Sequence, residues 1–393
     1  MKNKIVYFGL LLLTITMLTG CSTKSAGSFY KSGQRCFQSG NYEDAVIYYV
    51  KAIAANPNRA EYYIDYGITL IVLEQYEEAL TQFDHAYLDK NIRMVKENNK
   101  RAYRGKGIAY YLMQKYEEAI TQFGLALSIS ELSELDMDIL YYKGSSLMAT
   151  GDYQQATEAY SGIITADEKA ADAFFNRAYC YLELGDYENS LTDYDKAIAL
   201  NPDCYDYYLG KYYLLTDTLK DAEAVEILAL AAGIGAKTDE DQYNLAKVHY
   251  YQGNYVTALL EFNDSYTKGI LESSFYIGEI YREQKDFTKA NFYYETLIGE
   301  GKVLFPAVYN QLGSCLIKSG NYQEAIDSLE KGISYHRADS MRVLLKNEIV
   351  AYEGLGQFDV AKEKLESYLA NYPEDEGGLL EEEFLKTRMI EIE

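Results

Sequence analysis

The chain contains no tryptophan, three histidines and four prolines among its 393 residues. The histidines His85, His249 and His336 lie tens of residues apart, and the sequence has no HExxH, G-x-S-x-G or Walker-type phosphate-binding motif. We therefore assign no catalytic residue, no metal ligand and no cofactor, and we expect that the protein is not an enzyme.

Basic residues are also few, with 37 lysines and arginines against 60 acidic residues and a formal charge of −23. A nucleic-acid-binding surface needs clustered basic residues that displace counterions from the phosphates. The composition therefore argues against a nucleic-acid partner, and the acidity favours solubility of an elongated molecule.

Ten positions recur along the chain at intervals of 32 to 40 residues, nine of them aromatic, and each is followed three residues later by alanine or serine. A period in this range indicates stacked supersecondary units rather than a compact domain around one central site. The positions are Tyr42, Tyr76, Tyr116, Tyr153, Tyr187, Leu219, Tyr255, Phe287, Tyr322 and Phe358.

The residues around each of these positions predict a pair of helices. In the first unit, Tyr42, Ala45 and Tyr49 recur at the three- and four-residue spacing of one helix face, and Gly40 before them suits the end of the preceding helix. A glycine lies nine residues before the turn position in seven units, where a close approach of two helices would require it. We infer that each unit is a helix, a short turn and a second helix.

This pattern resembles the tetratricopeptide repeat (TPR) family across about residues 26–373. Unit two carries the family motif as Tyr63, Gly67, Leu70, Ala79, Phe83 and Ala86. The resemblance implies an all-α, right-handed superhelical solenoid of about ten TPR helix-turn-helix repeats at residues 29–373. It also implies a C-terminal capping helix at residues 374–393, in which we expect Leu379, Leu380, Phe384, Met389 and Ile390 to cover the last apolar face. Unit six departs most, with Leu219 at the turn and Glu226 at a usually aromatic place, so we expect irregular packing there.

The first twenty residues have the organisation of a bacterial lipoprotein signal peptide. Lys2 and Lys4 precede an apolar run at 5–18, which is shorter than the ~20 residues of a spanning helix, and Leu18-Thr19-Gly20-Cys21 resembles a lipobox. The resemblance implies cleavage after residue 20, lipidation of Cys21 and a tether at 21–28. We therefore expect a lipid-anchored protein on the extracytoplasmic face of a bacterial plasma membrane or outer membrane.

In the family, the first helix of each repeat lines the concave groove, and the resemblance places an aromatic ladder there. Three interpretations remain open: a groove for a peptide or protein partner, a surface that stacks on cell-wall glycans, and packing between first helices. A subunit role in an envelope secretion or assembly machine is a further alternative. The candidate groove residues are Tyr111, Tyr141, Phe175, Tyr179, Tyr207, Tyr243, Tyr250 and Phe275.

Two other features bear on partners. Residues 90–106 are rich in basic side chains, with Lys100, Arg101 and Arg104 as a candidate basic patch for an acidic partner or lipid headgroups, although a solvated helix face would give the same pattern.

Some family members hold a partner's C-terminal carboxylate with a lysine and an asparagine on the first helix. Tyr30 and Gln34 occupy the matching places in unit one, so that clamp is not expected here.

The cysteines after Cys21 form no CxxC pair, which argues against metal or redox chemistry. We expect buried free thiols, although Cys180 and Cys204 lie in adjacent units and a disulfide between them stays open. The four residues are Cys36, Cys180, Cys204 and Cys315.

Overall fold

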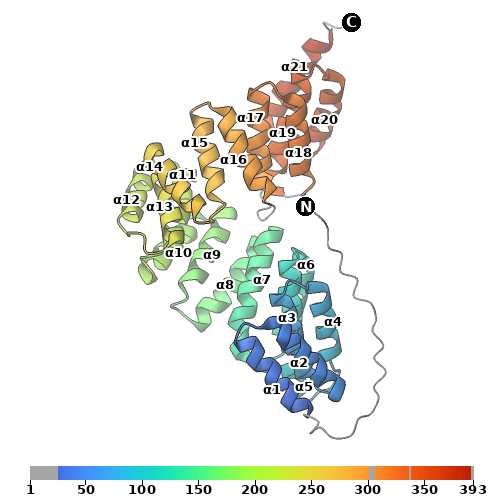
Figure 1. Ribbon diagram of the computed structural model, residues 1–393. Coiled ribbons are helices and arrows are strands. Elements are labelled where there is room, and N and C mark those ends of the chain that lie inside the picture. Colours follow the sequence, from blue (N-terminus) through green and yellow to red (C-terminus); the bar gives the residue numbers. More distant parts are fainter. Residues whose placement is uncertain (1–24, 301–305, 336–337, 391–393) are drawn as a thin grey trace. The chain divides into compact units, whose positions relative to one another are not determined.

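The computed structural model describes residues 25–300, 306–335 and 338–390 (Figure 1). In this part of the chain it contains 21 α-helices and one short 3-10 helix, and no strand. The predicted signal peptide at 1–20, the lipidation site Cys21 and most of the tether lie outside the described residues. The expected all-α class is confirmed.

The helices form two compact units, residues 1–185 and 186–393, which we call the N-terminal unit and the C-terminal unit. The helices of the N-terminal unit are α1 (Ala26–Gln38), α2 (Tyr42–Ala55), α3 (Ala60–Val72), α4 (Tyr76–Ala86), α5 (Arg93–Leu112), α6 (Tyr116–Leu127), η1 (Ser133–Leu135), α7 (Asp136–Thr150), α8 (Tyr153–Ala166) and α9 (Ala171–Glu183). The helices of the C-terminal unit are α10 (Tyr187–Leu200), α11 (Tyr205–Asp217), α12 (Asp221–Ala232), α13 (Asp239–Tyr251), α14 (Tyr255–Thr267), α15 (Ser273–Glu283), α16 (Phe287–Gly299), α17 (Pro306–Lys318), α18 (Tyr322–Ile333), α19 (Ala338–Gly354), α20 (Phe358–Asn371) and α21 (Glu376–Ile390).

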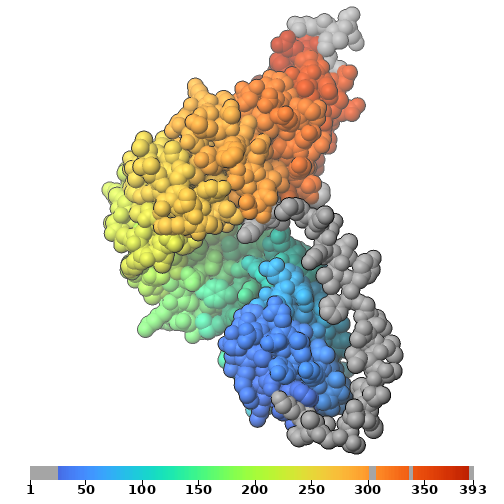
Figure 2. Space-filling view, in the orientation of Figure 1, coloured from blue at the N-terminus to red at the C-terminus, as the bar shows by residue number. Residues whose placement is uncertain are grey.

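Along the chain, α1–α20 form ten successive helix pairs with turns of two or three residues, and α21 follows them. Within each unit, consecutive helices contact one another, and the first helices of neighbouring pairs also meet, as α1 meets α3 and α11 meets α13. Side chains fill the space between neighbouring helices of each unit (Figure 2). Within each unit, the helices therefore bury their apolar faces against the helices next to them in the chain.

The turn between the two helices of a pair always contains one residue with positive φ, two places before the second helix begins. A left-handed residue ends the first helix and turns the chain back. Six of the ten are glycines, for which this conformation is not strained. The ten residues are Gly40, Glu74, Gln114, Gly151, Gly185, Leu219, Gly253, Lys285, Gly320 and Gly356.

The sixth pair corrects the predicted register. Leu219 is not the first residue of a second helix; it occupies the left-handed turn place with φ 57° and is 85% exposed. The helix begins at Asp221, the predicted small residue Ala222 is exposed, and Ala224 is buried in its place. Tyr187, Asp221 and Tyr255 are then evenly spaced at 34 residues, so the irregularity lay in the alignment rather than in the repeat length.

The predicted need for glycine nine residues before the turn position is confirmed in six of the seven units; the seventh glycine, Gly210, was placed with the wrong register and lies eleven residues before Asp221. A Cβ on Gly107 would lie 2.4 Å from the ring of Phe123, and one on Gly278 would lie 2.5 Å from Tyr294. The glycine therefore makes room for the large side chain of the facing helix. The same approach occurs for Gly33 on Tyr49, Gly67 on Phe83, Gly144 on Tyr160 and Gly313 on Leu329.

The helix after the last pair, α21, packs on α20, as expected of a capping helix. Its buried contact is Leu385, which joins the cluster of Ile349, Leu365 and Tyr368. The predicted contact residues Leu379, Leu380 and Phe384 are instead exposed. The helix turns a different face to the core, because Asp375 fixes its first turn through Arg342 and Lys346 of α19. The side chains of Met389 and Ile390 lie outside the described residues.

The four cysteines in the described part of the chain form no disulfide bond. Cys180 and Cys315 are buried as expected, whereas Cys36 and Cys204 are partly exposed. Burial raises the pKa of the Cys180 thiol to about 12 and that of Cys315 to about 11, so both stay protonated at neutral pH. We therefore expect the Cys180 and Cys315 thiols to be unreactive at neutral pH.

Candidate functional site

The predicted groove residues lie on the first helices of their pairs. In the N-terminal unit, Tyr111, Tyr141, Phe175 and Tyr179 are partly buried on α5, α7 and α9. In the C-terminal unit, Tyr243, Tyr250 and Phe275 are partly buried on α13 and α15. Each of these side chains is partly buried, as packing between first helices requires, and partly exposed, as binding of a peptide, protein or glycan requires.

Tyr207 is a correction to the predicted groove. Its side chain is 2% exposed in α11, so its ring belongs to the core. The place was assigned by counting back from Leu219, and the two-residue error of register moves the corresponding place to Leu209, which is also buried. The expected aromatic ladder is therefore interrupted in the sixth repeat.

Several groove residues of the N-terminal unit pack on other rings. The Tyr111 ring lies 5.8 Å from that of Tyr116 and 5.5 Å from that of Tyr142, centroid to centroid. Tyr141 lies 6.1 Å from Tyr160 in an edge-on arrangement, a preferred geometry for aromatic pairs. Packing thus buries part of the surface of each ring. The rest of the ring surface is exposed, and its role in binding stays a prediction.

In the C-terminal unit, Tyr276 joins the predicted residues into one aromatic cluster. Its ring lies 6.1 Å from Tyr243, 5.5 Å from Tyr250 and 5.4 Å from Phe275. Burial raises the pKa of the Tyr276 hydroxyl well above its ordinary value, so it stays protonated. Tyr276 follows the predicted place by one residue, and the sequence analysis did not single it out.

The predicted basic patch is also corrected. Lys100 is 0% exposed, and its Nζ donates to the Ile129 carbonyl at 2.8 Å and pairs with Asp136 Oδ1 at 2.6 Å. Arg104 pairs with Asp138 at 2.5 Å. Because these acidic partners come from the start of α7, two of the three patch residues hold neighbouring repeats together. Arg101 alone is exposed and makes no ion pair with the described residues.

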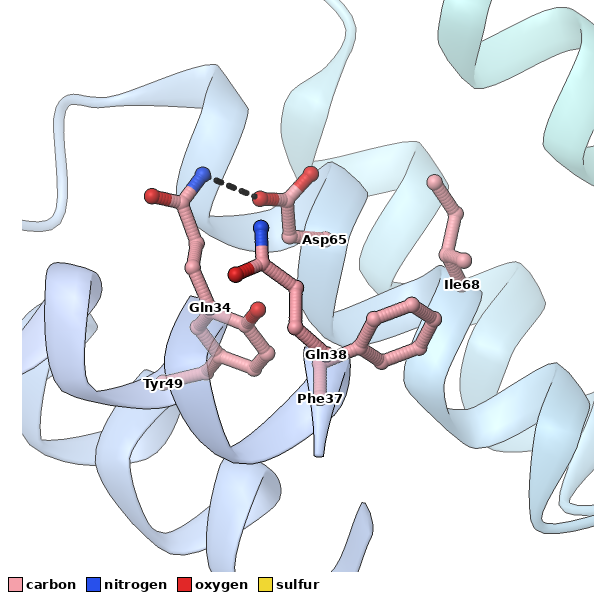
Figure 3. Close-up of a pocket in the computed structure, with 6 residues that line it drawn as sticks. All are labelled: Gln34, Phe37, Gln38, Tyr49, Asp65 and Ile68. Carbon is pink, nitrogen blue, oxygen red and sulfur yellow. Dashed lines mark hydrogen bonds between the residues drawn. The ribbon is translucent and has the colours of Figure 1, made fainter. Parts of the chain in front are cut away.

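An open pocket that the sequence analysis missed lies between α1 and α3, with a volume of about 250 Å³ (Figure 3). Gln34, Phe37 and Gln38 line it from α1, Asp65 and Ile68 from α3, and Tyr49 from α2. In Figure 3 the amides of Gln34 and Gln38 lie on the side of Asp65, and Phe37 lies on the side of Ile68. The pocket thus has a polar wall and an apolar wall.

The Asp65 carboxylate is held by neutral donors only. The Tyr30 hydroxyl donates to Oδ2 at 2.7 Å and the Gln34 amide donates to the same oxygen at 3.2 Å. Asp65 Oδ1 has no hydrogen-bond partner among the described residues. One carboxylate oxygen is therefore fixed and the other is unused.

Burial raises the pKa of the Asp65 carboxyl above its ordinary value. The two hydrogen bonds and the Arg101 charge act in the opposite direction, and the Glu61 charge adds to the rise. Burial, then the charge of Asp65, raise the pKa of Tyr30, so its hydroxyl remains a donor. The site is a partly desolvated anion whose charge its neighbours do not neutralise.

Tyr30 and Gln34 occupy the two places that the family resemblance assigns to a clamp for a partner's carboxylate. Here both side chains hold a carboxylate of this chain, so the site has the opposite polarity. The sequence analysis did not single out Asp65, because an aspartate on a helix of an acidic chain is usually solvated. A carboxylate thirty-five residues after Tyr30, one repeat further on, is the signal that could have found it.

No group of three or more metal-ligating side chains occurs in the described ranges. Over the same residues, no helix combines the length and apolar character that crossing a bilayer requires.

Family models described as tetratricopeptide repeat match the chain in both units. The matched residues are 30–94, 67–130, 171–204, 272–300, 306–339 and 349–375. These segments cover several of the repeats defined by the helix pairs.

The chain is similar in part to curated proteins. Hsp70-Hsp90 organizing protein 1 of Glycine max is 40% identical over 60 residues, which are 15% of this chain and 10% of that protein. BBSome complex member BBS4 of Bos taurus is 25% identical over 207 residues, which are 51% of this chain and 38% of that protein. The chain thus spans well under half the length of these two relatives.

The chain is similar to solved structures of other proteins. A tetratricopeptide repeat protein from Parabacteroides merdae matches with a TM-score of 0.50 at 17% identity, over 65% of this chain and 97% of that one. YrrB, described as a TPR protein with an unusual peptide-binding site, matches with a TM-score of 0.41 at 22% identity, over 47% of this chain and 91% of that one.

Proposed function

Because the chain is built from tetratricopeptide repeats, we propose that it is a scaffold that binds protein or peptide partners along the first helices of its repeats. The observation that carries the proposal is the presence, within each unit, of partly exposed tyrosine and phenylalanine side chains on these helices, at Tyr111 and Tyr141 in the N-terminal unit and at Tyr243 and Phe275 in the C-terminal unit. Aromatic rings already fixed by packing lose little conformational freedom on binding and supply large contact areas.

We further propose that lipidation at Cys21 anchors the protein to the extracytoplasmic face of a bacterial membrane. The basic start, the short apolar run and Leu18-Thr19-Gly20-Cys21 support this proposal. Metabolic labelling with an alkyne analogue of palmitate tests it: label on the wild-type chain should be lost in Cys21→Ala, and the variant should leave the membrane fraction. Equal labelling of the two proteins would contradict the anchor.

In-cell photocrosslinking tests the scaffold itself. A photoreactive residue in place of Tyr243 on α13 or Phe275 on α15 should capture a defined protein. The matched control is Val256, which is 78% exposed on the second helix of the Tyr243 pair. Capture from the first helices but not from Val256 supports the proposal. Equal capture from all three positions, or capture of no protein, contradicts it and turns the search to glycans.

A further inference from the structure

The pocket between α1 and α3 presents an anion to solvent without an internal counter-charge. Asp65 Oδ2 accepts from Tyr30 and Gln34, and both donors are neutral. Arg101 is near enough for its charge to lower the pKa of Asp65 and Glu61, but it makes no ion pair with either in the described chain. The site therefore lacks the cation that commonly accompanies a carboxylate withdrawn from water.

The shape of the pocket limits the kind of cation that fits. Phe37 and Ile68 supply an apolar wall, and the Asp65 carboxylate lies at the other side with the amide nitrogens of Gln34 and Gln38 beside it (Figure 3). A single carboxylate offers too few oxygen ligands for a calcium or magnesium site. A long side chain with a methylene stem and a charged head satisfies both walls, because such side chains bury the stem and pair the head.

We propose that this pocket receives a lysine or arginine side chain of a partner protein, with the stem against Phe37 and Ile68 and the head on the Asp65 carboxylate. The proposal rests on the scaffold function and names the chemistry of its partner. Charge complementarity agrees, because a chain with a formal charge of −23 attracts basic segments. An acidic segment is disfavoured, because it would face the unneutralised carboxylate.

The test uses the full chain and immobilised twelve-residue glycine-serine peptides that carry three lysines, three arginines, three norleucines or three acetyl-lysines. Wild-type protein should bind the lysine or arginine peptide at least about tenfold more tightly than both uncharged peptides. Asp65→Asn should remove this preference. Asp44→Asn, an exposed carboxylate on α2 that changes the net charge equally, should retain it.

A second variant keeps the proposal falsifiable if Asp65→Asn disturbs folding. Gln38→Lys adds a tethered ammonium at the pocket rim, leaves Asp65 in place and should reduce binding of the basic peptides about tenfold. Gln38→Met is its uncharged control. Equal binding of basic and uncharged peptides, or identical behaviour of Asp65→Asn and Asp44→Asn, overturns the proposal.

Photocrosslinking from Gln38 separates this inference from the scaffold function. If Tyr243 and Phe275 capture a partner and Gln38 captures it in a manner that depends on Asp65, both stand. If Tyr243 and Phe275 capture a partner while capture from Gln38 is absent or indifferent to Asp65→Asn, the scaffold stands and the basic-side-chain pocket fails. If no position captures a protein, the scaffold function fails, and the peptide measurement decides the pocket separately.

Discussion

Asp65 and Asp375 are both carboxylates held between helices, one in the N-terminal unit and one in the C-terminal unit, but their partners differ in charge. Asp65 accepts from a hydroxyl and an amide. Asp375, with a side chain 2% exposed, pairs with Arg342 and with Lys346 at 3.0 Å and accepts from the Gly378 backbone at 2.7 Å. Burial raises the pKa of Asp65, and the hydrogen bond from Arg342 holds the pKa of Asp375 well below its usual range.

This difference separates a structural carboxylate from an available one. Two cations and a helix N-terminus already satisfy Asp375, so it has no capacity for a ligand and instead fixes α21 on α19. Both carboxylates border open pockets, but Asp65 lacks a cation, so a cationic ligand would gain an interaction there that the free protein does not have. The buried Lys100 belongs with Asp375, because Asp136 and a backbone carbonyl satisfy it within the N-terminal unit.

The largest expected effect is at Lys100. Lys100→Ala removes a fully buried cation, leaves Asp136 and the Ile129 carbonyl without it, and opens a cavity. We expect the free energy of unfolding of the N-terminal unit to fall by about 2–4 kcal/mol in urea denaturation. Lys96→Ala, which breaks a partly exposed pair with Glu131, should cost less than about 1 kcal/mol. Equal losses in the two variants would mean that burial of the pair does not matter.

Asp375→Ala should have the next largest effect on stability. It removes the partner of Arg342 and Lys346 and the acceptor for the first turn of α21, which should destabilise docking of that helix by about 1–3 kcal/mol. Hydrogen exchange of the α21 amides should accelerate while exchange in α11–α14 stays unchanged. Unchanged protection of α21 would show that Leu385 alone holds the helix.

The docking of α21 should also weaken as pH rises. Burial, and then the neighbouring Glu381 carboxyl, raise the pKa of Glu353 from 4.5 to about 8. The folded state therefore binds more protons than the unfolded state between these values, so stability decreases as pH increases from about 4.5 to 8. Protection of α21, corrected for intrinsic exchange rates, should be lower at pH 9 than at pH 6.

Glu353→Gln should abolish this decrease, and Glu382→Gln, whose carboxyl pairs with Lys386 on the same helix, should retain it. The same slope in wild type and Glu353→Gln would assign the effect to another group. Asp375 acts in the opposite direction, since its lowered pKa contributes stability that is lost at acidic pH.

The smallest effect should be that of Asp65→Asn on stability. The amide oxygen of asparagine still accepts from Tyr30, and no cation loses its partner, so the free energy of unfolding should change by less than about 1 kcal/mol. Asp375→Asn should be clearly less stable than wild type in the same urea series. Similar losses for both variants would remove the distinction between the two carboxylates.

The sequence predicted the helix pairs because each depends on local residues. A glycine faces a large side chain sixteen residues later, as Gly67 faces Phe83, and an aromatic residue begins the second helix, as Tyr76 begins α4. The sixth register was wrong because Leu219 is apolar and precedes a helix, and nothing in its identity marks the left-handed place that glycine usually takes.

The candidate site was less predictable because its energetics come from different repeats. Lys100 appeared to be one of several exposed bases, and its burial depends on Ile129 and Asp136, which lie beyond the next helix. The environment of Asp65 likewise depends on another repeat, because its hydrogen-bond donors Tyr30 and Gln34 belong to the preceding one. Composition alone cannot distinguish a carboxylate paired with cations from one held by neutral donors.

The most direct test is a titration of the aspartate carboxyl groups by carbon-13 NMR of the full chain, with Asp65 and Asp375 assigned from their asparagine variants. We predict that Asp65 titrates above the ordinary aspartate value, that Asp375 titrates well below it, and that the trilysine peptide lowers the pKa of Asp65 alone. Ordinary titration of both groups, or a peptide that leaves Asp65 unmoved, would contradict the account.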